Sequence, residues 1–168
     1  EIGRIQVLTP LVATVFLFAI FVGVQARSLF GGATFVETTT GLTFAEYARG
    51  GFFQLVFGST LVLPLVYFAP AIAGPLDERA TRLLRGLLGV QLGLTALVLA
   101  SALWRMALYV GAYGLTIDRI NGTAVMVWIA ATLGVLAVTV VRGRPQAAAF
   151  GSLIGAVVAL GALNLANP

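Results

Sequence analysis

Apolar residues fill the chain in long runs that are separated by short polar breaks. A membrane-crossing helix needs roughly 20 mainly apolar residues, because each residue advances about 1.5 Å along the axis. The runs have this length, and they lack the alternation of apolar and polar residues that is typical of a membrane β-barrel. The pattern predicts an all-α, polytopic membrane bundle with five transmembrane helices, over residues 5–26, 44–71, 83–109, 123–141 and 147–165.

The first run has a second interpretation, because Arg4 precedes it as in a secretory signal peptide. The run is longer than a typical signal-peptide core, and no A-x-A cleavage site follows it, so we expect a retained helix. The chain begins with Glu1 and ends without a polar tail. We therefore expect residues 1–168 to form a single transmembrane domain that is part of a longer protein.

Composition agrees with a membrane location. Hydrophobic residues make up 60% of the chain and charged residues 10%, with a mean hydropathy of +1.03. A soluble protein is about half apolar and a quarter charged. The net charge of +4 is not arranged as a basic stripe with interleaved aromatic residues, so we expect membrane lipids as partners and no nucleic acid.

The arginines predict an orientation, because the cytoplasmic side of a membrane protein carries the excess of basic residues. All ten basic residues are arginine. With the five helices above, six fall on the side of the N-terminus (Arg4, Arg79, Arg82, Arg85, Arg142, Arg144) and four on the other side (Arg27, Arg49, Arg105, Arg119). The N-terminus is thus expected in the cytoplasm, in a bacterial inner membrane. The loop with Arg79, Arg82 and Arg85 is expected to meet anionic lipid headgroups.

Missing residue types exclude several chemistries. The chain has no histidine and no cysteine, which removes the usual ligands of zinc, copper, haem and iron–sulfur clusters. All six acidic residues fall in predicted loops or near helix ends, so no carboxylate is expected at mid-membrane for proton or cation coupling. No P-loop or G-x-S-x-G motif occurs. We expect a protein that is not an enzyme and has no metal or cofactor of its own, although it can bind lipids.

Polar residues gather at the predicted end opposite the N-terminus. The T-x-x-E pattern of Thr43 and Glu46 is typical of a helix N-cap, and Arg49 lies three residues further on. Arg105, Tyr109 and Tyr113 are spaced by four, which places them on one helix stripe. We predict an interfacial polar cluster of Glu46, Arg49, Arg105, Tyr109, Tyr113 and Arg119, with an ion pair from Arg105 to Glu46 or Asp118. A structural role and a lipid or partner contact both remain open for this cluster.

Small residues and turns predict how the helices pack. Gly89 and Gly93 have G-x-x-x-G spacing, as do Gly151 and Gly155, and such spacing lets helix backbones approach closely in lipid. The short turn at residues 141–145 predicts an antiparallel pair of the fourth and fifth helices. Asn121 to Thr123 match a glycosylation sequon, which we interpret as a turn followed by a helix start.

Four stretches resemble a bacterial multi-pass membrane family. They are "LVATVFLFAIFVGVQARSLFGG", "GLTFAEYARGGFFQL", "ASALWRMALYVGAYGLT" and "ALNLANP", and together they span nearly the whole chain. The chain is similar in these stretches to domain of unknown function 4173, which is related to domain of unknown function 4153. The resemblance implies a multi-pass fold with further helices upstream, and it implies no particular activity.

These observations favour a non-catalytic membrane subunit or scaffold, an accessory part of a larger membrane complex. A sensor that passes a signal across the bilayer is one alternative, and a transporter of small molecules or lipids is another. A water-filled polar cavity would favour the transporter.

Overall fold

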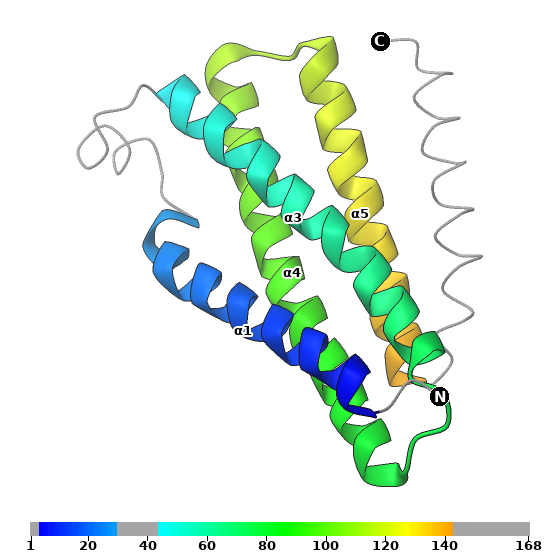
Figure 1. Cartoon of the computed structure of the whole chain (residues 1–168). Helices are drawn as coiled ribbons and strands as arrows, with labels where there is room; N and C mark the ends of the chain where they lie inside the picture. Colours follow the sequence, from blue (N-terminus) through cyan, green and yellow to red (C-terminus); the bar gives the residue numbers. More distant parts are fainter. Residues whose placement is uncertain (1–3, 30–43, 143–168) are drawn as a thin grey trace.

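The described part of the chain consists of four helices (Figure 1). The computed structural model describes residues 4–29 and 44–142, and it describes side chains for residues 7–24, 55–70, 72–140 and 142. The helices are α1 (Arg4–Leu29), α3 (Phe44–Ile72), α4 (Glu78–Tyr113) and α5 (Ile117–Val141). The fifth predicted helix, over residues 147–165, lies outside the described residues.

Three of these helices are long and apolar enough to cross a membrane. The apolar spans are Val7–Val24 in α1, Glu78–Tyr113 in α4 and Ile117–Val140 in α5. In α3 the described apolar stretch is shorter, Leu55–Pro70. All regular secondary structure of the described residues is helical, as the apolar runs predict, and the spans indicate a membrane-embedded protein.

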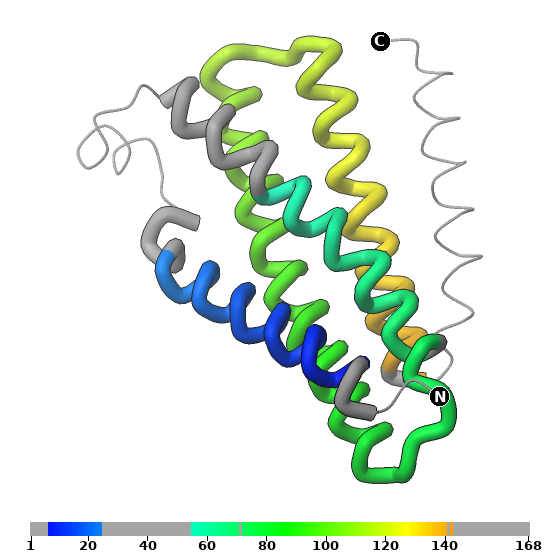
Figure 2. The backbone as a smooth tube through the Cα atoms, in the orientation of Figure 1, coloured from blue at the N-terminus to red at the C-terminus, as the bar shows by residue number. Residues whose placement is uncertain are grey.

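Helix α4 is the centre of the bundle. It packs against α1, α3 and α5, whereas these three helices make fewer contacts with one another. Figure 2 shows that α3, α4 and α5 run in alternating directions, joined by short connections at opposite ends of the bundle. Fully buried side chains from all four helices, including Leu11, Val66, Leu99 and Ile129, form the core.

Helix α4 is longer at both ends than the range 83–109 that hydropathy predicts. It begins at Glu78 because the Asp77 carboxylate caps it, accepting a hydrogen bond from the backbone N–H of Ala80 at 3.1 Å. Its first turn extends beyond the apolar run and carries exposed arginines. At the other end it stops at Gly114, whose φ of 75° is readily adopted only by glycine.

Helix α5 begins six residues before the predicted 123, at Ile117. Thr116 is its N-cap residue, with an extended backbone and no side-chain cap hydrogen bond. Asn121 therefore lies inside the helix, and the turn that we predict at the sequon is wrong. Asn–Gly favours a turn only where the flanking backbone permits one, and here the residues on both sides are helical.

Candidate functional site at the α4–α5 connection

Arg119 holds the end of α4 against the start of α5. Its Nη1 donates a hydrogen bond to the carbonyl oxygen of Tyr113 at 2.9 Å and another to that of Gly114. The Arg119 guanidinium carbon lies 4.2 Å from the ring centroid of Tyr109 and 5.9 Å from that of Tyr113. We call Tyr109, Tyr113, Gly114 and Arg119 the Arg119 cap.

The position of Arg119 is explained by the backbone carbonyl groups that lack partners at the C-terminus of α4. The last four carbonyl groups of a helix have no partner within the helix, and the end carries partial negative charge. The N–H of Gly114 bonds the Val110 carbonyl oxygen at 2.8 Å. Arg119 reaches back from the first turn of α5 to two carbonyl groups at this end, while the tyrosine rings provide a cation–π surface. The cap thus fixes the angle at which α5 leaves α4.

The two tyrosines meet as their i, i+4 spacing predicts. Their ring centroids are 5.2 Å apart and the ring planes are inclined at 59°. Tyr109 is half-buried, whereas 51% of Tyr113 is exposed. The stripe therefore runs from the interior of the bundle to its surface.

Arg105 is the inner end of this stripe. Only 4% of its side chain is exposed, and it has an interaction partner. The predicted partner Asp118 is exposed in the first turn of α5. Glu46 and Arg49 belong to the first turns of α3, and their side chains lie outside the described residues. The structure thus brings together Tyr109, Tyr113 and Arg119, and the predicted ion pair between Glu46 and Arg105 stays a prediction.

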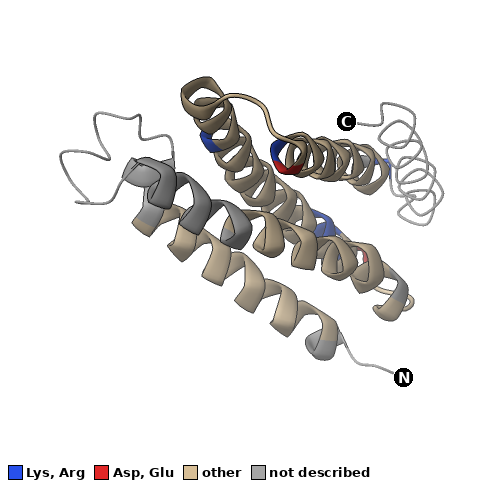
Figure 3. Cartoon of the chain, turned by 90° about the horizontal axis from the view of Figure 1, so that it is seen from above, with Lys and Arg blue, Asp and Glu red and all other residues tan. Residues whose placement is uncertain are grey.

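The basic residues of the opposite end border two neighbouring grooves on α4. Arg79 and Arg82 flank a shallow apolar groove of about 630 Å³ over Leu83, Leu87 and Val90. Arg85 instead lies at the end of a larger groove between α4 and α5. Figure 3 shows the charged residues near helix ends, with long uncharged stretches between them.

A buried polar row on α4 is a feature that the sequence analysis misses. Gln91, Thr95 and Ser101 are completely buried, about one to four turns before Arg105. The Thr95 hydroxyl donates to the Gln91 carbonyl oxygen at 2.7 Å. Within the described part of the chain, neither the nitrogen nor the oxygen of the Gln91 side-chain amide has a hydrogen-bond partner. The i, i+4 spacing of Gln91 and Thr95 inside an apolar run is the signal that would have identified the row.

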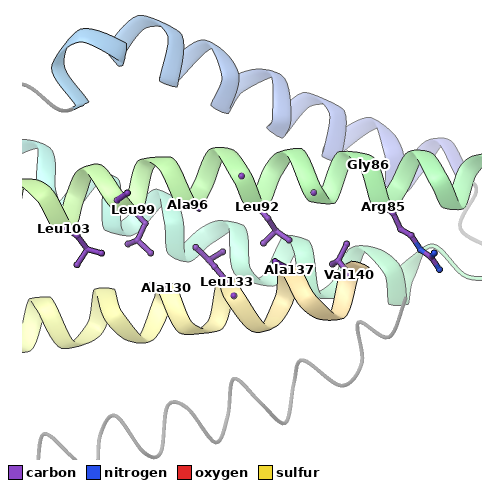
Figure 4. A pocket seen from close by; sticks show the side chains of 14 residues that line it. Arg85, Gly86, Leu92, Ala96, Leu99, Leu103, Ala130, Leu133, Ala137 and Val140 are labelled. Carbon is purple, nitrogen blue, oxygen red and sulfur yellow. The ribbon is translucent and has the colours of Figure 1, made fainter. Parts of the chain in front are cut away.

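The larger groove runs along α4 and α5 (Figure 4). Its volume is about 840 Å³. Small and aliphatic residues line it, and Arg85 at one end is its charged residue; the small ones are Gly86, Gly89, Gly93, Ala96 and Ala100 of α4 and Ala130, Gly134 and Ala137 of α5. The groove suits an apolar segment, and apart from Arg85 it has no polar lining for a hydrated solute.

Comparison with known proteins identifies one family. The family model described as "Domain of unknown function (DUF4153)" matches residues 1–168. The resemblance to the related domain 4173 is not shown by this match. No curated protein and no solved structure matches the chain.

Proposed function

We propose that this chain, which belongs to the domain of unknown function 4153 family, is a non-catalytic membrane subunit or scaffold within a larger membrane complex. The observation that carries the proposal is the surface beside the Arg119 cap. Leu115 and Ile117 are 70% and 56% exposed there, next to the exposed ring of Tyr113. Tyrosine and arginine are enriched at protein interfaces, and the cap holds this surface rigidly, so little entropy is lost on binding.

The buried hydroxyl groups support a structural role for the interior. Ser59 donates to the Leu55 carbonyl oxygen at 2.8 Å, and Thr132 to that of Trp128 at 2.9 Å, each within its own helix. Such back-bonded hydroxyls are satisfied locally and are not directed toward a solute. Together with the apolar lining of the described grooves, they favour a scaffold over a transporter of polar molecules.

Orientation and lipid contacts belong to the same proposal. The N-terminal turn of α4 would face the cytoplasm of an inner membrane, with Arg79 and Arg82 on anionic headgroups. In this arrangement the chain binds lipids and partner subunits, and it carries no cofactor. Because the chain has no cysteine, an impermeant thiol reagent applied to intact cells should label Asp118→Cys and leave Glu78→Cys unlabelled.

Co-purification tests the scaffold directly. The tagged chain is extracted from its native membrane in mild detergent as wild type, Leu115→Ser and Leu83→Ser. Leu83 is 60% exposed at the opposite end of α4 and serves as the matched control. We expect a stoichiometric membrane partner with wild type and Leu83→Ser, and its loss with Leu115→Ser. Isolation of the wild-type chain alone, or equal recovery of the partner with both variants, would contradict the proposal.

A further inference from the structure

The glycines of the α4/α5 groove face space that the described helices leave empty. A Cβ atom added at Gly86, Gly89, Gly93 or Gly134 would meet no described atom within 4 Å. Glycines at such spacing in a membrane helix favour the close approach of another helix backbone. The groove thus has the lining of a helix-packing surface, although none of the four described helices fills it.

We propose that residues 147–165 of this chain fill the α4/α5 groove as a helix parallel to α4. The path of the chain supports this occupant. Helix α5 ends at Val141, and Val140 lies with Arg85 at one end of the groove. The apolar segment follows after the five residues 142–146, so it starts beside the groove and returns antiparallel to α5.

The lengths of groove and segment agree. On α4 the groove extends from Arg85 to Leu103, which is about 27 Å at a rise of about 1.5 Å per residue. The 19 residues of 147–165 make a helix of about 28 Å. The segment therefore reaches from one end of the groove to the other.

The small residues of the two helices also agree in register. On α4 they are Gly86, Gly89, Gly93, Ala96 and Ala100, and the residues 62 positions later are Ala148, Gly151, Gly155, Val158 and Ala162. Four of these five later residues are again glycine or alanine, the exception being Val158, and parallel helices rise equally per residue, so this offset brings small residues together at four levels. A connection over residues 142–146 that returns the chain to the level of Val140 and Arg85 would give the same offset, because residue 147 would then lie level with Arg85. Gly89–Gly93 would then face Gly151–Gly155, which explains both G-x-x-x-G pairs.

Disulfide cross-linking tests this register in the full chain, which has no native cysteine. Ala96→Cys with Val158→Cys places thiols at one aligned level, and Leu97→Cys with Val158→Cys is the control, because Leu97 does not line the groove. A disulfide needs Cα atoms about 4.4–6.8 Å apart. A protease site inserted between Arg144 and Pro145 reports the link, since the fragments stay joined only when it has formed within one chain.

We expect the cleaved fragments of the Ala96 pair to remain joined without reductant and those of the Leu97 pair to separate. Links that form only between chains would assign the groove to a second copy. Absence of a link, as expected if a lipid acyl chain fills the groove, or equal linking of both pairs would also overturn the proposal. The result is independent of co-purification, so either proposal can fail alone.

A volume change in the groove provides a second measurement. Gly93→Leu would displace the segment, which should abolish the Ala96–Val158 link and lower the thermal unfolding midpoint in detergent. Gly111→Leu is the matched control on α4, because Gly111 is exposed outside the groove and an added Cβ there also meets no described atom. Unchanged linking and an unchanged midpoint in Gly93→Leu would show that the groove holds no helix.

Discussion

The two packing faces of α4 differ in side-chain volume. The packed face carries Leu88, Gln91 and Thr95, each with at most 1% of its side chain exposed. The groove face carries Gly89 and Gly93, with space beside them. In lipid an apolar residue gains little by turning inward, because lipid tails are as apolar as leucine. Close packing therefore distinguishes a helix contact from a lipid contact in this protein, and hydropathy does not.

The largest change in the free energy of unfolding is expected from a large-to-small substitution on the packed face. Leu88→Ala would leave a cavity beside α4 and lower the free energy of unfolding by about 2 kcal/mol. This value is at the low end for such substitutions, because the unfolded helices remain in lipid, where the leucine side chain is also in an apolar environment. Leu97→Ala, at a 39% exposed position, should cost less than about 0.5 kcal/mol. Unfolding in mixed micelles measures both. Equal losses would remove the distinction between the faces.

Hydropathy marks apolar residues only, and this decides how much of α4 can be predicted from the sequence. Its apolar run predicts the helix, but the run cannot predict the start at Glu78, because an Asp77 cap and exposed arginines extend the helix beyond the membrane-like residues. The contact between Tyr109 and Tyr113 is predictable, since i, i+4 neighbours meet within one helix.

The bond from Arg119 to the end of α4 is not predictable from spacing. It depends on how Gly114 and Thr116 turn the backbone between two helices. The surroundings of the three arginines near the start of α4 are likewise not predictable from the sequence. The sequence analysis places them together in one loop, whereas the helix begins earlier, and Arg85 borders a different groove from Arg79 and Arg82.

A smaller change in the free energy of unfolding, of opposite sign, is expected when the buried polar residue Gln91 on the packed face is replaced by an apolar one. A buried amide without hydrogen bonds costs about 1–3 kcal/mol, and Gln91 has none for its amide within the described residues. Gln91→Leu keeps a similar volume and should raise the free energy of unfolding by about 1 kcal/mol. Gln91→Glu is the control and should lower it, because a carboxylate would be buried without a partner. A destabilised Gln91→Leu would mean that the amide is used by a partner in the assembled protein.

The smallest effect is expected one turn further along the same face. Thr95 is as buried as Gln91, but its hydroxyl is satisfied by the Gln91 backbone carbonyl oxygen at 2.7 Å. Thr95→Val keeps the shape and removes a back-bond that contributes little to a helix, so the free energy of unfolding should change by less than about 0.5 kcal/mol.

The two substitutions together test which atoms are coupled. The Thr95 hydroxyl contacts the carbonyl oxygen of Gln91 and not its side-chain amide. The effects of Gln91→Leu and Thr95→Val should therefore add within about 0.5 kcal/mol in a double-mutant cycle. A coupling above about 1 kcal/mol would mean that the hydroxyl and the amide share a partner. The packed face of α4 would then contain a polar network, and the contrast with the groove would be one of chemistry as well as volume.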